Sequence, residues 1–212
     1  FSSDRGCGWG TVGLFLMNVD GTNVQRLTGT TTAPDGSPFC EPVVDRHASF
    51  SPDGTKLVFA SSLVPGGPPT NRDIFLLDLQ GTWPSNVIRL THDPANDSRP
   101  VFTPDGKKIV FVSDRAGNND IYIMNIDGTG VTRLTDDPAD DDVPNISPDG
   151  TKITFTSNRS GNYEVYVMNI DGTNVVNLTN NPADDGDSYF SSDGTKITFI
   201  STRDGNFEVY VM

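Results

Sequence analysis

Residues 102–135 read FTPDGKKIVFVSDRAGNNDIYIMNIDGTGVTRLT, and this segment returns further along the chain. Close copies begin at Ile146 and Phe190, and a looser copy begins at Phe50. The aspartate of the first Asp-Gly pair falls at positions 53, 105, 149 and 193, so the last two intervals are both 44 residues. Self-similarity at a fixed period of about 40 to 45 residues is typical of a repeat architecture.

Each copy predicts four strands, which we name a to d in chain order. In the copy quoted, strand a is a short piece that ends in Phe102-Thr103, and strands b, c and d cover 108–113, 120–125 and 131–135. Asp-Gly joins a to b and c to d. Two-residue hairpin turns need a positive φ, which Gly and Asp tolerate. Hairpin connections predict an antiparallel sheet.

Strands b and c are apolar on both of their faces. Ile121 and Ile123 point to one side of the sheet, and Tyr122 and Met124 point to the other. A sheet that is buried on both sides needs neighbours on both sides, which a radial array of blades supplies. We therefore predict an all-β fold, a β-propeller of four-stranded antiparallel blades in one domain over residues 1–212. A β-sandwich of unrelated strands would give no reason for the period.

The repeats predict five blades in this segment, with approximate bounds 1–47, 48–99, 100–143, 144–187 and 188–212. Strand b and strand c each occur five times, whereas strands a and d each occur four times. The first blade is therefore expected to lack strand a and the last to lack strand d. The alternative is an arc of a six-bladed ring. Open sheet edges invite pairing with a neighbouring copy of the chain.

The repeat motif resembles the WD40-like PD40 repeat of TolB-like propellers. Phe-Ser-Pro-Asp-Gly-Thr-Lys at 50–56 opens the motif, and the later copies add Ser-x-Arg, Gly-Asn, Tyr-Val-Met-Asn and Asp-Gly-Thr. The resemblance implies a periplasmic or extracellular binding scaffold that mediates contacts between proteins. The alternative that it implies is an accessory propeller of a larger secreted enzyme, a peptidase or a polysaccharide lyase.

Charge and hydropathy limit the classes of partner that the chain is expected to bind. The formal net charge of −13 and the absence of a Lys/Arg cluster in the sequence argue against binding of nucleic acid. No apolar run approaches the roughly 18 residues that a membrane-spanning helix needs. A protein partner, or a neighbouring copy, is the expectation that remains.

Insertions relative to the 44-residue repeat gather in the b–c and d–a connections of the first two blades. The first holds Cys7 and Trp9, the second holds Phe39 and Cys40, and the third covers 62–72. Trp9 and Phe39 are candidate anchors for a partner, since insertions on one face of a repeat array often mark the binding side. Neutral loop drift is the alternative. Cys7 and Cys40 form a disulfide or remain two thiols; a bridge would indicate an oxidising compartment.

An aspartate stands five residues before the end of each strand a, in the d–a connection: Asp45, Asp97, Asp141 and Asp185. If the four carboxylates ring one mouth of a central channel, they suit Ca²⁺, Mg²⁺ or a basic group of a partner. The alternative is that each carboxylate bonds its own turn or pairs with the recurrent Arg of Ser-x-Arg. No cofactor is expected to be required.

The sequence does not favour an enzyme. Catalysis needs a base, a nucleophile or a metal, and His47 and His92 are the only histidines, with no Gly-x-Ser-x-Gly or His-Glu-x-x-His motif. His47 lies two residues after Asp45 and is a candidate binding residue. We therefore predict a non-catalytic scaffold.

Overall fold

The computed structural model describes residues 2–3, 13–28, 31–32, 38–39, 44–62, 71–80 and 86–212, with the backbone alone described for 2–3, 31–32 and 38–39. All the regular elements in these ranges are β-strands, and no helix there could cross a membrane. The chain divides into two compact units: Phe1–Phe50 with Gly54–Pro100, and Ser51–Asp53 with Val101–Met212.

The first unit holds one three-stranded and one four-stranded sheet, each with its strands side by side in chain order. Its strands are β1 (Ser2–Ser3), β2 (Gly13–Leu16), β3 (Gln25–Arg26), β4 (Thr31–Thr32), β5 (Pro38–Phe39), β6 (Asp45–Phe50), β7 (Lys56–Ser61), β8 (Asp73–Asp78) and β9 (Val87–Arg89). The blades are β1 to β3 and β6 to β9, and β4 and β5 pair as a hairpin within the insertion, which the sequence did not predict.

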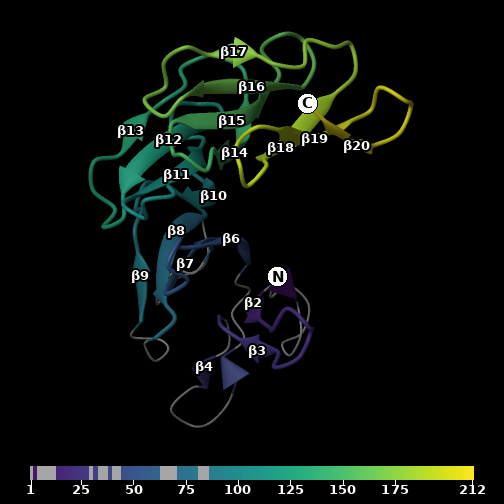
Figure 1. Ribbon diagram of the computed structural model, residues 1–212. Helices are drawn as coiled ribbons and strands as arrows, with labels where there is room; N and C mark the ends of the chain where they lie inside the picture. The colour runs from purple at the N-terminus through teal and green to yellow at the C-terminus, as the bar shows by residue number, and fades with distance from the viewer. Residues whose placement is uncertain are drawn as a thin grey trace. The chain divides into compact units, whose positions relative to one another are not determined.

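The remaining strands continue the same order (Figure 1). They are β10 (Asp97–Phe102), β11 (Lys108–Ser113), β12 (Asp120–Asn125), β13 (Thr132–Arg133), β14 (Asp141–Ile146), β15 (Lys152–Ser157), β16 (Glu164–Asn169), β17 (Val176–Asn177), β18 (Asp185–Phe190), β19 (Ile197–Ser201) and β20 (Glu208–Val211). β10 to β13 and β14 to β17 are four-stranded antiparallel sheets, and β18 to β20 is a three-stranded one.

The blades confirm the predicted repeat. The described residues form five blade sheets, of which the first lacks strand a and the last lacks strand d. Strands b and c of the third blade occupy 108–113 and 120–125, as the sequence predicted. Strand d is shorter than predicted, because only Thr132 and Arg133 pair with strand c.

The turns differ from the two-residue hairpins that the sequence predicted. Thr103 N donates to Lys108 O at 2.9 Å, so four residues separate the paired ends of the a–b turn, and three separate Asn125 from Thr129 in the c–d turn. Only the glycine of each Asp-Gly pair has a positive φ, 68° at Gly106 and 83° in the c–d turn. The aspartate instead accepts the backbone N–H two residues later, an Asx turn that lengthens the loop.

The core of each unit is built from strands b and c. Both faces of β12 are buried, as predicted, from Ile121 and Met124 at 0% exposure to Ile123 at 9%. A ring on strand b packs directly across from a ring on strand c in four blades, with centroids 5.7 to 5.8 Å apart: Phe59 with Phe75, Phe111 with Tyr122, Phe155 with Tyr166 and Phe199 with Tyr210. Such pairs stabilise a sheet beyond the area that they bury.

Candidate functional site

The four recurrent aspartates are buried at the start of strand a. Asp45, Asp97, Asp141 and Asp185 are the first residues of β6, β10, β14 and β18, and none is more than 2% exposed. The sequence analysis placed them in the connection before strand a. This was wrong, because each aspartate is the first residue of the strand itself. Their carboxylates therefore need partners inside the protein.

Arginine supplies the partner in the last two blades. Arg159 Nη2 lies 2.7 Å from Asp141 Oδ2, and Arg203 Nη2 lies 2.8 Å from Asp185 Oδ2. The same Arg159 donates from Nε to Ser157 Oγ at 2.9 Å and lies over the aromatic pair of its blade. The motif Ser-x-Arg thus holds a buried carboxylate, which is the structural role that the sequence offered as the alternative to a cation site.

Asp45 lies in a blade where the Ser-x-Arg motif has no arginine. Leu63 stands in its place in the sequence and lies outside the described residues. Ser61 Oγ donates to Asp45 Oδ1 at 2.5 Å, and burial raises the pKa of this carboxyl above its ordinary value. Thr28 and the charge of Arg26 also act on the carboxylate and lower its pKa, but the effect of burial is the largest.

The other predicted site residues are only partly placed. Within the described ranges, no three His, Cys, Asp or Glu side chains gather as a metal site, and the divalent cation stays a prediction. Cys7, Trp9 and Cys40 lie outside the described residues, as does the side chain of Phe39. The disulfide and the two aromatic anchors therefore stay predictions as well.

Sequence analysis missed a second buried acid, at the first residue of strand c. Asp73 pairs with Arg89 at 2.6 Å and Asp120 pairs with Arg133 at 2.7 Å, each across to strand d. Burial raises the pKa of both carboxyls. The sequence did contain a signal for this acid, since Asp or Glu is the first residue of every strand c from the second blade onward. The residue on strand d that pairs with it, however, changes between repeats.

A β-bulge interrupts strand a and gives its third residue a left-handed backbone. The residues are His47 (φ 53°), Arg99 (φ 50°), Val143 (φ 52°) and Asp187 (φ 47°). The register shifts at this point in β6, β14 and β18. A positive φ is uncommon outside glycine and is strained for a β-branched residue such as valine. We call this set the bulge positions.

The bulge positions keep one backbone conformation but change their side chain in every repeat. The residue two places before each of them is always aspartate. A purely structural position would be expected to repeat its residue, as that aspartate does. Bulges often re-aim a side chain beside a functional site. The bulge positions therefore combine a constant backbone conformation with side chains that differ from blade to blade.

In the first unit one bulge position is arginine, and the other is a histidine surrounded by arginines. His47 lies among Arg46, Arg72 and Arg99, and desolvation together with these three charges lowers the pKa of His47 to about 4. Arg46 neighbours it on β6, and Arg72 precedes strand c. A positive cluster therefore occurs in a chain whose formal net charge is −13.

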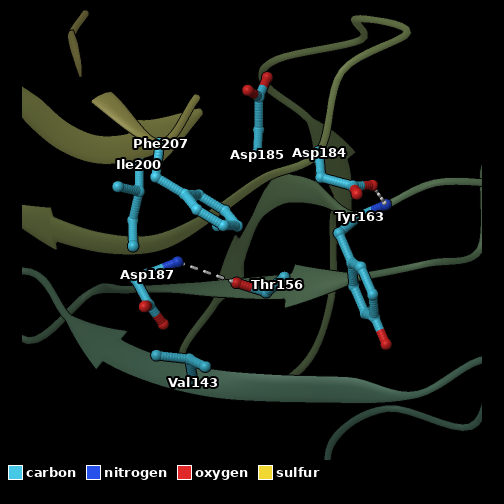
Figure 2. A pocket seen from close by; sticks show the side chains of 9 residues that line it. Val143, Thr156, Tyr163, Asp184, Asp185, Asp187, Ile200 and Phe207 are labelled. Atoms are coloured by element: carbon cyan, nitrogen blue, oxygen red, sulfur yellow. Dashed lines mark hydrogen bonds between the residues drawn. The ribbon is translucent and has the colours of Figure 1, made fainter. Parts of the chain in front are cut away.

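In the second unit the bulge positions line a cavity of about 290 Å³ between the last two blades (Figure 2). Its lining residues are Val143, Thr156, Tyr163, Asp184, Asp185, Gly186, Asp187, Ile200 and Phe207. Tyr163 and Phe207 occupy the same repeat position, the residue before strand c. The cavity is therefore built from strands a and b, from the b–c connections and from the d–a connection of the last two blades.

Hydrogen bonds hold the walls of the cavity in place. Tyr163 N donates to Asp184 Oδ1 at 3.1 Å, and Asp187 N donates to Thr156 Oγ1 at 3.3 Å (Figure 2). A Cβ added at Gly186 would meet Thr156 Oγ1 at 3.1 Å, so the small residue allows the two blades to approach. These contacts hold the backbone at Tyr163 and Asp187 and the side chains of Asp184 and Thr156.

Comparison with known proteins points to one family. The chain matches the family described as "TolB beta propeller domain" (PD40) over residues 42–146 and 136–212. The "Tol-Pal system protein TolB" of Bordetella pertussis is 50% identical over 44 residues, which are 21% of this chain and 10% of that protein.

Solved structures extend the similarity to the whole chain. TolB from Acinetobacter baumannii is 26% identical with a TM-score of 0.76, over 100% of this chain and 47% of that one. This chain thus spans about half of its length. A puromycin-hydrolyzing peptidase of Mycobacterium tuberculosis is similar over 95% of this chain and 32% of that one, with a TM-score of 0.68. At 14% identity that likeness shows the fold alone.

Proposed function

Because the chain belongs to the TolB beta-propeller family, we propose that it is a non-catalytic scaffold that binds a protein partner outside the cytoplasm. Within each unit, the partner would dock beside the b–c connections and the bulge positions. The name of the Bordetella relative, a component of the Tol-Pal system, supports a role among other proteins and a periplasmic location. A neighbouring copy of the chain is a second candidate partner.

The single observation that carries the proposal is the set of bulge positions. Four blades hold the same strained conformation, yet they present an imidazole, a guanidinium, an isopropyl group and a carboxylate. Strain that persists in four blades calls for a compensating role, and a varied set of side chains on a constant frame is how a recognition surface is adapted.

The two units carry opposite charges beside their bulge positions. Arg46, Arg72 and Arg99 make the first unit locally cationic, whereas Asp184 and Asp187 make the cavity of the second unit acidic. Each of these two regions favours a partner group of the opposite charge. No described residue needs to act as a base or a nucleophile for this function.

A capture experiment tests the proposal. The variant changes all four bulge positions to asparagine, which tolerates their backbone: His47→Asn, Arg99→Asn, Val143→Asn and Asp187→Asn. The matched control changes exposed residues near the a–b and c–d turns: Lys107→Asn, Val131→Asn and Lys196→Asn. Immobilised wild-type chain and both variants are exposed to periplasmic extract of the source organism, and bound proteins are identified by mass spectrometry.

We expect wild type and control to retain the same protein and the fourfold variant to lose it. Far-UV circular dichroism and a thermal melt establish that the variant is folded. Retention of that protein by the folded fourfold variant would remove the bulge positions from the function.

The alternative of an accessory propeller keeps the same surface and changes what it docks against. The sequence of the full-length protein would distinguish the scaffold from the accessory propeller. A peptidase or polysaccharide lyase domain in the same chain would favour the accessory role.

A further inference from the structure

The cavity of the second unit joins an apolar wall to a carboxylate that has no partner. Val143, Ile200 and Phe207 supply the wall, and Phe207 is 71% exposed. Asp187 is also exposed, and its carboxylate has no hydrogen-bond or ion-pair partner among residues 101–212, all of which are described. An unpaired charge beside exposed apolar surface is a combination that binding of an amphipathic group would satisfy.

We propose that this cavity binds the side chain of a lysine or arginine from the protein partner. The methylene stem would lie against Phe207 and Ile200, and the cationic head would reach Asp187. This inference rests on the proposed function, and it names the group that one part of the binding surface recognises.

The size and shape of the cavity suit such a side chain. A volume of about 290 Å³ lies at the lower end of ligand pockets, so it takes one or two side chains rather than a large molecule. Lysine and arginine bury an apolar stem while their charged end stays near water. The exposed rings of Phe207 and Tyr163 also attract a cation over their faces.

The charges around the cavity favour a cation over an anion. None of its nine lining residues is basic, and three are aspartates. Asp185 is already held by Arg203, and Asp184 accepts a hydrogen bond from Tyr163 N. Asp187 is the carboxylate left for a ligand, and Figure 2 shows its side chain extending toward Val143 at the floor of the view.

The first unit provides an internal contrast at the equivalent positions. Arg99 and His47 stand where the second unit has Asp187 and Val143, and Arg72 stands where it has Tyr163. A ligand that binds through its positive charge should therefore affect the second unit and not the first. This contrast separates specific binding from general attraction to a chain of net charge −13.

The test uses three capped peptides, Ac-Gly-Xaa-Gly-NH₂ with Xaa as lysine, norleucine or glutamate. Norleucine keeps the stem of lysine without its charge. Each peptide is titrated into the ¹⁵N-labelled chain at low ionic strength, and amide shifts are followed by heteronuclear NMR. Asp187→Asn removes the charge and tolerates the backbone, and Asp136→Asn removes another exposed charge, outside the cavity.

We expect the lysine peptide to shift the amides of Gly186, Asp187 and Phe207, with saturation in the millimolar range. Asp187→Asn should weaken its binding roughly three- to fivefold, as for a partly exposed ion pair, and Asp136→Asn should leave it unchanged. The norleucine peptide should bind as weakly to wild type as the lysine peptide does to Asp187→Asn. The glutamate peptide should leave these amides unmoved.

Equal binding of the lysine and norleucine peptides would overturn the inference in favour of a purely apolar pocket. Equal effects of Asp187→Asn and Asp136→Asn would overturn it in favour of non-specific attraction, and so would the absence of shifts at the cavity. Each of these results leaves the capture experiment free to succeed, so failure of the cavity inference is distinguishable from failure of the proposed function.

Discussion

Arg159 Nη2 donates hydrogen bonds to both carboxylate oxygens of Asp141, at 2.8 and 2.7 Å. The Asp141 side chain is fully buried and that of Arg159 is 18% exposed. Arg159→Met should lower the free energy of unfolding by about 3–5 kcal/mol, because it leaves a buried carboxylate without a counter-charge. Urea unfolding measures the change.

The double variant with Asp141→Asn is the control for that prediction. It should cost less than the sum of the two single variants, because the second change removes the charge that the first one leaves unpaired. Additive losses, or a loss below about 0.5 kcal/mol for Arg159→Met alone, would contradict a role for the pair in stability.

Gly172 should tolerate alanine less well than Gly161. Both glycines have a positive φ, 85° and 106°, so each substitution is strained by about 1 kcal/mol. A Cβ at Gly172 would also lie 2.6 Å from Leu134 O, whereas a Cβ at Gly161 meets nothing within 4 Å. Gly172→Ala should therefore cost roughly 1–3 kcal/mol more in thermal or urea unfolding. Equal losses would show that the neighbouring backbone moves away freely.

Val143→Asn should stabilise the chain despite the loss of an apolar side chain. Valine is β-branched and strained at a φ of 52°, whereas asparagine often adopts this conformation. Relief of the strain should raise the free energy of unfolding by about 0.5–1 kcal/mol. Val131→Asn, at an exposed valine without a positive φ, should show no gain, and a gain of the same size there would refute the explanation by strain.

His47 should make the stability of the chain depend on pH. Its pKa is about 4 in the folded chain, lowered by desolvation and by Arg99, Arg72 and Arg46, against about 6.5 when unfolded. Between these values the unfolded state binds the proton more strongly, so stability falls as the pH is lowered from about 6.5 to 4.

The comparison with His47→Asn isolates this effect. From pH 7 to pH 4.5 the variant should lose less stability in urea unfolding than the wild type. NMR titration of the two imidazoles, assigned with His92→Gln, measures the pKa of His47 directly. A value near 6.5 would show that the arginines do not act on it.

The sequence predicted the strands best where both faces of a strand are apolar. Strands b and c match their predicted bounds because two independent signals indicated them: the apolar residues on both faces of each strand, and the repetition of the segment every 44 residues. Turn length was predicted wrongly, because the same Asp-Gly pair fits several turns and the Asp side chain decides among them. The cavity was not predicted, because its lining residues come from separate strands and connections of two blades.

The sequence alone determined the blade, its copy number in this segment and the burial of both faces of strands b and c, since these depend on local alternation and on a period that any copy reveals. Only the tertiary structure decided which repeated aspartates meet an arginine and where the backbone bulges. It also decided that Val143 and Asp187, 44 residues apart, line one cavity. The reason is that bulges and contacts between blades depend on how neighbouring sheets pack. The sequence of one repeat does not specify how its blade packs against the next.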